Sequence, residues 1–308
     1  MENTNPKLIV TGASGFLGGW LAALGRANWE VHAVWWSNPF ELPGVVVHRC
    51  DLTDAAAVAR LFREVRPNAV IHAAAQANLD WCEDHPDEAR AVNVGATRTL
   101  AELASESETR LVFVSTDMVF DGEKGNYSED DPVNAISVYG QTKVEAEEVV
   151  RAVAPEAAIA RTALIFGKPR VGGTSFSEWI EARLRNGEVV PLFTDQYRTP
   201  ILVQNLSEAL LELAGNRFAG TLHLAGTERI DRYTFGQKYA SKLGLPLELL
   251  RPTRLKDARF RAPRPRDLSL DVTRTRRILK TPLLDVDTAL DRLVRDDLTS
   301  DPKARHSE

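Results

Sequence analysis

A short apolar run near the start of the chain ends in a glycine-rich turn, which opens a stretch typical of a helix. Lys7–Thr11 reads Lys-Leu-Ile-Val-Thr, as a buried parallel strand does, and the turn after it carries Gly12, Gly15 and Gly18. Gly12 permits a tight turn, Gly15 lets a pyrophosphate approach the backbone, and Gly18 allows close packing of the helix that runs to about Arg26. The helix N-terminus offers free N–H groups to phosphates. This order of strand, turn and helix predicts a dinucleotide-binding unit.

Stretches typical of strands and of helices alternate through about the first 160 residues. We expect further strands over 30–36, 45–48, 69–72 and 110–115, and helices over 53–63, 80–105 and 135–153. This alternation predicts an α/β fold with a parallel, doubly wound sheet of the Rossmann type. Right-handed crossovers bring the carboxyl ends of such strands to one edge of the sheet, where ligands bind.

The chain is expected to divide into two lobes. Residues 1–166 form the predicted NAD(P)-binding domain, with return segments near 195–225, and residues 167–300 form a smaller, discontinuous α/β lobe for substrate. Residues 301–308 are expected to be a frayed tail. Within the second lobe we expect helices over 176–185, 203–214 and 233–243 and a strand over 221–224.

Composition excludes several classes of protein. A net charge of -5 argues against a nucleic-acid binder, and no apolar run reaches membrane-spanning length. Cys50 and Cys82 provide no disulfide framework, and the polar N-terminus lacks the apolar segment of a signal peptide, so we expect a cytoplasmic protein. No metal site is expected, because the spacing of the candidate ligands matches no ligand set. Those candidates are His72, Asp80, Glu83 and His85.

Tyr139 and Lys143 lie four positions apart, so on a helix their side chains share one face. An ammonium beside a phenol favours the phenolate, which predicts a lowered pKa for Tyr139. Such a tyrosine can exchange a proton with a carbonyl or alcohol oxygen as a hydride arrives at or leaves the carbon. The hydroxyl of Thr116, at the end of a strand, could bind the same oxygen. The same helix carries three acids that we expect to form a solvated face: Glu145, Glu147 and Glu148.

The second predicted strand bears on the choice of cofactor. A carboxylate at its end would bind the adenosine 2′-OH of NAD and repel a 2′-phosphate, but the chain reads Trp-Trp-Ser-Asn over 35–38. The missing acid favours NADP(H) and leaves NAD(H) possible, with Ser37 at the ribose. Asp51, after the third strand, is placed to meet an adenine edge; alternatively, it begins the helix over 53–63.

Several stretches, taken together and in order, resemble the dTDP-4-dehydrorhamnose reductase family of extended short-chain dehydrogenase/reductases. They are Thr-Gly-Ala-Ser-Gly-Phe-Leu-Gly at 11–18, Ser-Thr-Asp-Met-Val-Phe-Asp-Gly at 115–122, Val-Tyr-Gly-Gln-Thr-Lys at 138–143, Arg-Thr-Ala-Leu-Ile-Phe-Gly at 161–167, Asp-Gln-Tyr-Arg-Thr-Pro at 195–200 and Arg-Pro-Arg-Asp-Leu-Ser-Leu-Asp at 264–271. The resemblance runs from about residue 7 to residue 295. It implies a reductase that transfers a hydride from a nicotinamide to the C4 carbonyl of a nucleotide-linked 4-keto-6-deoxy sugar. We expect a monomer or homodimer.

The resemblance also implies residue roles. Tyr139 is the proton donor, Thr116 contacts the sugar oxygen, and Lys143 binds the nicotinamide ribose and tunes the tyrosine. The other residues implied at the cofactor are Gly12, Ser14, Gly15, Phe16, Leu17, Gly18, Ser37, Asp51, Leu52, Ala73, Ala74 and Asn93. Those expected at the substrate are Asp117, Met118, Leu164, Arg264 and Arg266. The two arginines belong to an arginine-rich segment over 251–280, whose forked donors suit a diphosphate or, for most of its members, a solvated surface.

Two departures from the family pattern leave the sugar open. Met118 and Leu164 stand where the family has aromatic residues that stack on a deoxysugar ring. Met118 also replaces the glutamate that related dehydratases use for elimination. Two alternatives remain: a sugar-nucleotide epimerase, and a non-catalytic NADP-binding protein like the regulatory subunit of methionine adenosyltransferase.

Overall fold

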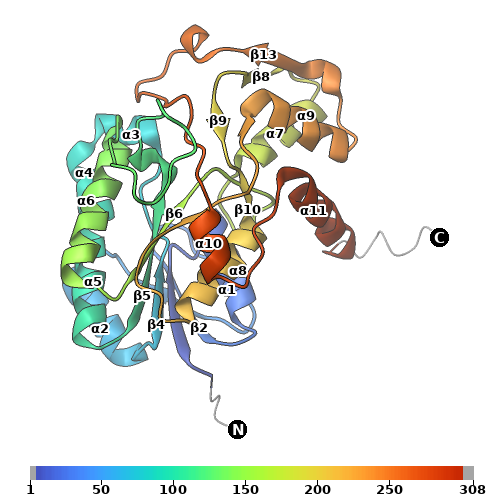
Figure 1. Ribbon diagram of the computed structural model, residues 1–308. Coiled ribbons are helices and arrows are strands. Elements are labelled where there is room, and N and C mark those ends of the chain that lie inside the picture. The colour runs from blue at the N-terminus through green and yellow to red at the C-terminus, as the bar shows by residue number, and fades with distance from the viewer. Residues whose placement is uncertain (1–4, 301–308) are drawn as a thin grey trace.

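The computed structural model describes residues 5–300 (Figure 1), so the tail expected over 301–308 lies outside the described residues. Seven parallel strands form the main sheet in the order β11 (Gly220–Leu224), β6 (Ala158–Thr162), β5 (Arg110–Thr116), β4 (Ala69–His72), β1 (Lys7–Thr11), β2 (Glu30–Trp35) and β3 (Val46–Arg49). The order reverses beside β1, as in a doubly wound dinucleotide-binding sheet. The predicted fold class is confirmed.

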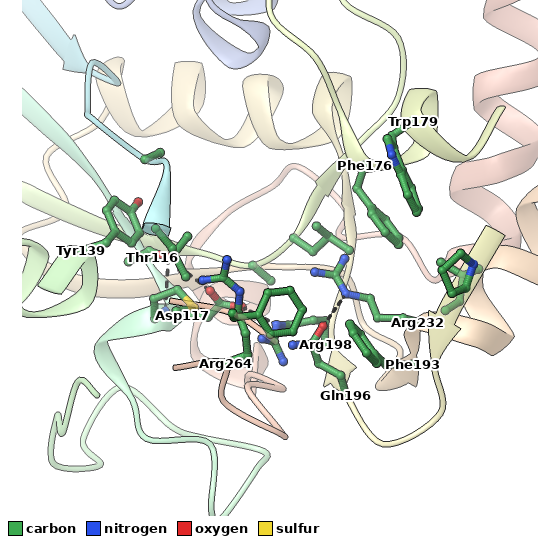
Figure 2. A pocket seen from close by; sticks show the side chains of 18 residues that line it. Thr116, Asp117, Tyr139, Phe176, Trp179, Phe193, Gln196, Arg198, Arg232 and Arg264 are labelled. Carbon is green, nitrogen blue, oxygen red and sulfur yellow. Dashed lines mark hydrogen bonds and ion pairs between the residues drawn. The ribbon is translucent and has the colours of Figure 1, made fainter. Parts of the chain in front are cut away.

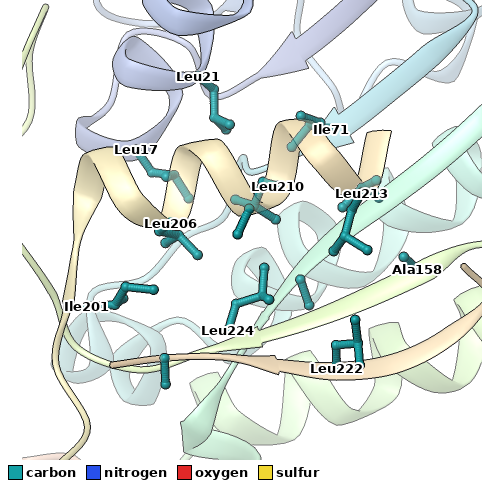
Figure 3. Close-up of a cluster of buried hydrophobic side chains, with 14 of the residues drawn as sticks. Leu17, Leu21, Ile71, Ala158, Ile201, Leu206, Leu210, Leu213, Leu222 and Leu224 are labelled. Atoms are coloured by element: carbon teal, nitrogen blue, oxygen red, sulfur yellow. The ribbon is translucent and has the colours of Figure 1, made fainter. Parts of the chain in front are cut away.

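Helices cover both faces of this sheet because its strands are apolar on both sides. Leu8 and Val10 of β1 face α1 and α8, whereas Ile9 faces the opposite layer. Figure 3 shows α8 directing its leucines toward the sheet and α1. One layer holds α1 (Phe16–Gly25) and α8 (Val203–Ala214); the other holds α2 (Ala55–Val65), α5 (Ala96–Glu106) and α6 (Val138–Val153).

The second lobe has a core of its own. A parallel pair of strands, β8 (Val190–Phe193) and β13 (Leu250–Thr253), packs with α7 (Phe176–Arg185), α9 (Arg232–Lys242) and α11 (Val286–Ser300). Small pairs join this lobe to the sheet domain: β7 (Ile165–Phe166) with β10 (Ile201–Leu202), and β9 (Tyr197–Arg198) with β12 (Ile230–Asp231). The remaining elements are α3 (Leu79–Asp84), α4 (Pro86–Arg90), α10 (Thr273–Ile278), a π-helical turn at Ala91–Gly95 and 3-10 turns at Asp117–Val119, Leu247–Leu249 and Leu255–Asp257. None of the helices described is both long and apolar enough to cross a membrane.

A segment that we call the strap, residues 262–271, crosses from the second lobe back to the sheet domain. Its Ala262 N–H donates to Asp80 Oδ1 at 3.0 Å, and its Asp267 N–H donates to the Gly122 carbonyl at 3.0 Å. Gly122 has φ +82°, and a Cβ there would lie 2.5 Å from Pro265 Cβ. The strap therefore lies directly on the loop that follows β5.

Two helix starts differ from expectation for reasons of capping. The helix expected over 135–153 begins at Val138, because Ser137 is extended and its Oγ accepts the Gly140 N–H. The helix expected from residue 53 begins at Ala55, and Asp54 caps it. Asp51 therefore does not cap this helix.

The expected solvated face of α6 is wrong for Glu147. Its side chain is fully buried and pairs with Arg161 of β6, whereas Glu145 is partly exposed and Glu148 is exposed. The sequence spacing on α6 could not reveal a partner that another strand supplies.

Candidate active site

A cavity of about 490 Å³ lies where the end of β5 meets the second lobe (Figure 2). Thr116 and Tyr139 both line it, so the structure brings together the two groups expected to meet one substrate oxygen. Asp117, Met118 and Leu164 line it as well. The second lobe contributes α7, β8, the start of α9 and Arg264 of the strap.

The tyrosine is neutral in this setting. Burial raises the pKa of Tyr139 above its usual range, and the nearby Thr116 hydroxyl opposes that rise only in part. The lowered pKa predicted from Lys143 is therefore wrong, because burial dominates. A phenol that keeps its proton can donate it to a developing alkoxide.

Lys143 is buried against β5, near the carboxyl end of that strand. Its Nζ donates to the Val114 carbonyl at 2.9 Å, and only 2% of the residue is exposed. Burial lowers the pKa of Lys143 to about 7, and the carboxylate of Glu147 acts in the opposite direction. The ammonium therefore loses its proton near neutral pH.

A second cavity, of about 390 Å³, follows the glycine-rich turn and the ends of β2 and β3. Among the residues expected at the cofactor, those that line it are Gly12, Ser14, Gly15, Ser37, Asp51, Leu52, Ala73 and Ala74. The side chain of Asp51 also accepts hydrogen bonds from the backbone N–H and hydroxyl of Thr53.

The glycine-rich turn fits a dinucleotide. Gly12 has φ +68°, and a Cβ there would come within 2.9 Å of the Ala74 backbone. A Cβ on Gly18 would lie 2.1 Å from the Gly12 carbonyl oxygen, so only glycine lets α1 start this close to the turn. At the other end of the cavity no acid follows β2, and the Arg49 guanidinium lies 4.8 Å from the centroid of the Trp36 ring.

Five residues expected at the cofactor do not line this second cavity. Gly18 and Leu17 are buried, and Phe16 is partly buried in α1. Asn93 is buried in the π-helical turn, where it accepts the Gln76 N–H and donates to the Gln76 carbonyl and Thr142 Oγ1. Asn93 thus holds the chain at the cavity edge. Lys143 lines neither the first nor the second cavity, and its Nζ is bound to the Val114 carbonyl.

The arginines divide into two groups. Arg266 is exposed and does not line the first cavity, contrary to the expectation that it faces the cleft. The backbone carbonyl of Arg266, rather than its side chain, binds a neighbouring strand: it accepts a hydrogen bond from the Tyr197 N–H. Arg264 does line the cavity, and its Nη2 donates to Asp80 Oδ1 at 3.0 Å.

Sequence reasoning missed three polar groups of this cavity: Gln196, Arg198 and Arg232. Gln196 and Arg198 belong to the Asp-Gln-Tyr-Arg-Thr-Pro stretch, which could have indicated them, whereas nothing in the sequence marked Arg232. Arg198 donates to the carbonyls of Tyr197, Pro265 and Arg266, and its Nε lies 3.6 Å from Asp117 Oδ2.

Two other guanidinium groups keep donors free. Arg232 Nε donates to Gln196 Oε1 at 3.0 Å, but the buried Nη1 atoms of Arg232 and Arg264 have no hydrogen-bond partner among the described residues. Burial lowers the pKa of Arg232 to about 9. Aromatic rings lie beside both groups, since Arg232 lies 4.3 Å from the Phe176 ring centroid and Arg264 lies 4.7 Å from that of Phe260.

A family model decides the relationship of this chain to known proteins. The model for the RmlD substrate binding domain matches residues 6–298. The chain belongs to this family. The resemblance to dTDP-4-dehydrorhamnose reductases, within the extended short-chain dehydrogenase/reductases, is confirmed.

Proteins similar to this chain carry different names. The chain is 36% identical to a probable low-salt glycan biosynthesis reductase of Haloferax volcanii, covering 86% of this chain and 89% of that one. It is 30% identical to the methionine adenosyltransferase 2 subunit beta of Bos taurus, covering 88% of this chain and 81% of that one. A crystal structure of dTDP-4-dehydrorhamnose reductase from Bacillus anthracis in complex with NADP has the same fold, with a TM-score of 0.86, 23% identity and coverage of 95% and 100%.

Proposed function

We propose that the chain is an NAD(P)H-dependent reductase of a 4-keto sugar, with Tyr139 as the proton donor. One observation carries the proposal: the Tyr139 phenol and the Thr116 hydroxyl line the same cavity beside a glycine turn that fits a dinucleotide. Membership of the RmlD family makes it an oxidoreductase of the extended short-chain type. The bound nicotinamide supplies the hydride.

The chain's own groups handle the substrate oxygen. Thr116 Oγ1 accepts the Met118 N–H at 3.2 Å, which fixes its position at the end of β5. Tyr139 stays protonated because it is buried, so it can give its proton to the alkoxide that forms on reduction. Lys143 lies one helical turn from Tyr139, where its ammonium can meet a ribose hydroxyl.

NADP(H) is the favoured cofactor, with NAD(H) possible. No carboxylate stands at the end of β2 to repel a 2′-phosphate, and Arg49 lies beside Trp35 and Trp36. The Bacillus anthracis reductase of the same fold is described in complex with NADP.

The sugar is proposed to be nucleotide-linked, as in dTDP-4-dehydrorhamnose. The Nη1 atoms of Arg232 and Arg264 have no hydrogen-bond partner among the described residues, which suits a diphosphate. A guanidinium group can bind two phosphate oxygens with two parallel hydrogen bonds. Phe176 and Trp179 stack at 6.0 Å, and Phe193 meets Phe260 at 5.9 Å, so both sides of the outer cavity offer aromatic surface for a base. Met118 and Leu164, which also line the cavity, leave the identity of the sugar open.

A non-catalytic role is the second candidate, because the beta subunit of methionine adenosyltransferase 2 from Bos taurus is a relative at 30% identity. The division into a domain over 1–166 and a lobe over 167–300, the monomeric or homodimeric state and the cytoplasmic location stay predictions. So do the roles of the individual site residues.

The test is NADPH oxidation by the purified protein with a panel of keto sugars, both nucleotide-linked and free. We expect turnover with a nucleotide-linked 4-keto sugar and little with the free sugar. Tight NADP binding without turnover on any substrate, together with a co-purifying partner protein, would favour the non-catalytic role. Interconversion of two sugars without net NADPH consumption would indicate an epimerase.

A further inference from the structure

Helix α6 packs on the end of strand β5 through three of its side chains. Three side chains on one face of α6, each four positions after the last, face the final three residues of β5. Tyr139 shares the first cavity with Thr116, Lys143 Nζ donates to the Val114 carbonyl, and Glu147 Oε1 accepts the Ser115 hydroxyl at 2.6 Å. Only the first two of these helix residues belong to the proposed chemistry.

The Glu147 carboxylate is completely buried, and both its oxygens are bound. Arg161 of β6 donates two hydrogen bonds to this carboxylate, from Nε at 2.9 Å and from Nη2 at 2.7 Å. Arg151, on α6 itself, adds a third nitrogen donor at 2.7 Å. The acid therefore ties α6 to β5 and β6 at once, directly behind Lys143.

We propose that Glu147 is a positioning residue for the reductase: it fixes the register of α6 on β5, and its buried negative charge, one helical turn from Lys143, favours the ammonium form of that lysine. The inference rests on the proposed function. A slip of α6 along β5 would separate Tyr139 from Thr116. Loss of the charge would leave the Lys143 ammonium, beside the Phe113 ring, without the nearby negative charge that opposes the effect of burial.

The groups around Lys143 and Glu147 support this assignment. Burial alone lowers the pKa of Lys143, and Glu147 is the group that opposes it. His72 of β4 also faces Lys143, but burial lowers the pKa of His72 to about 3, so it adds no positive charge at neutral pH. On the far side Glu147 faces Arg151, Arg161 and His223, and burial lowers the pKa of His223 to about 4.

The experiment compares pH profiles of kcat/KM. Glu147→Gln removes the charge and keeps the shape, so the high-pH limb, where Lys143 loses its proton, should move down by about one pH unit. Glu147→Asp restores the charge and should return the limb toward that of the parent. Glu145→Gln, on the same helix and paired only at the surface with Arg90, is the matched control and should leave the limb in place.

A second variant guards against a Glu147→Gln protein that fails to fold. Arg151 is about half exposed, and its removal leaves Glu147 less neutralised. Arg151→Gln should therefore move the same limb in the opposite direction, to higher pH, by a few tenths of a unit. Movement in the same direction as Glu147→Gln, or none in either variant, would overturn the electrostatic part of the proposal.

The Ser115→Ala variant tests the register. It removes the hydrogen bond between β5 and the Glu147 carboxylate, so kcat should fall by roughly tenfold or more without moving the limb, because a hydrogen bond to a charged group is stronger than one between neutral groups. An unchanged kcat would contradict the positioning role.

An NMR titration of the 13Cε signal of Lys143, in protein labelled with 13C-lysine, needs no turnover. If the parent reduces no substrate, the proposed function fails, yet the midpoint of Lys143 must still shift between parent and Glu147→Gln. An unshifted midpoint would refute the role of Glu147 independently.

Discussion

The Nζ atom of Lys143 lies 4.0 Å from the centroid of the Phe113 ring and donates a hydrogen bond to the Val114 carbonyl. A lysine buried in this way is held at a cost in free energy, because its charged form loses hydration. The position is what one expects of a residue retained for its chemistry.

Lys143→Met should make the protein more stable and less active. Replacing the buried ammonium by an apolar side chain of similar length removes the cost of dehydrating the charge, so the free energy of unfolding should rise. Thermal unfolding and NADPH oxidation measure the two effects. Lys124→Met, at an exposed lysine paired with Asp131, is the control; it should lower stability only slightly and leave activity unchanged. A less stable Lys143→Met protein would show that the lysine is a net stabilising residue.

The pH dependence of stability follows from the same lysine. The pKa of Lys143 falls from 10.5 to about 7 on folding, so between these values the unfolded chain binds more protons than the folded one. Stability from this residue is therefore lowest below pH 7 and rises with pH, by at most about 1.4 kcal/mol per pH unit. Urea unfolding of the parent and of Lys143→Met at several pH values between these limits checks it. The difference between the two proteins should shrink as pH rises.

Tyr139→Phe should lose most turnover and keep its affinity for NADPH. General acid catalysis is worth about 10²- to 10⁴-fold, and the ring itself, which packs in the core, is retained. Stopped-flow or steady-state NADPH oxidation gives the rate, and NADPH fluorescence gives the affinity. A variant as fast as the parent would remove the tyrosine from the mechanism.

Arg232→Gln and Arg264→Gln should each raise KM for a nucleotide-linked substrate by roughly 10- to 100-fold, the value of a hydrogen bond to a charged group. The effect should be absent for the free sugar, which has no diphosphate. Arg266→Gln is the matched control in the same segment, because its side chain is exposed and outside the cavity. Equal losses for all three variants would indicate a general effect of net charge.

Gly12→Ala should abolish dinucleotide binding, whereas Gly187→Ala should have a small effect. Both glycines have positive φ, +68° and +72°, so each substitution strains the backbone by about 1–3 kcal/mol. Only at Gly12 would the new Cβ also meet the Ala74 backbone, at 2.9 Å; around Gly187 nothing lies within 4 Å. Calorimetric titration with NADPH separates strain from contact. Retained binding in Gly12→Ala would contradict the fit to the cofactor.

The sequence predicted well those features that depend on neighbouring residues. The helix Phe176–Arg185 and the strand Lys7–Thr11 have the expected bounds, because apolar spacing and end signals are local. The convergence of Thr116 and Tyr139 also followed, since parallel strands end at one edge of the sheet.

Features that depend on distant partners could not be predicted. Glu147 reads as a surface acid until Arg161, on another strand, is placed against it. The pKa of Tyr139 depends on how completely the fold encloses the phenol, which spacing to Lys143 does not reveal. Arg232 lies at the start of α9, directly after β12. Because β12 pairs with β9, Arg232 is placed beside Gln196 at the cavity.

The crossing of the strap has a consequence for how such enzymes diversify. Because β11 completes the sheet from beyond residue 220 and the strap returns to the loop after β5, neither lobe is one continuous piece of the gene. Exchanging one terminal module for another would therefore cut through both lobes. Side chains on the cavity wall, such as Met118 and Leu164, can be replaced without cutting the strap.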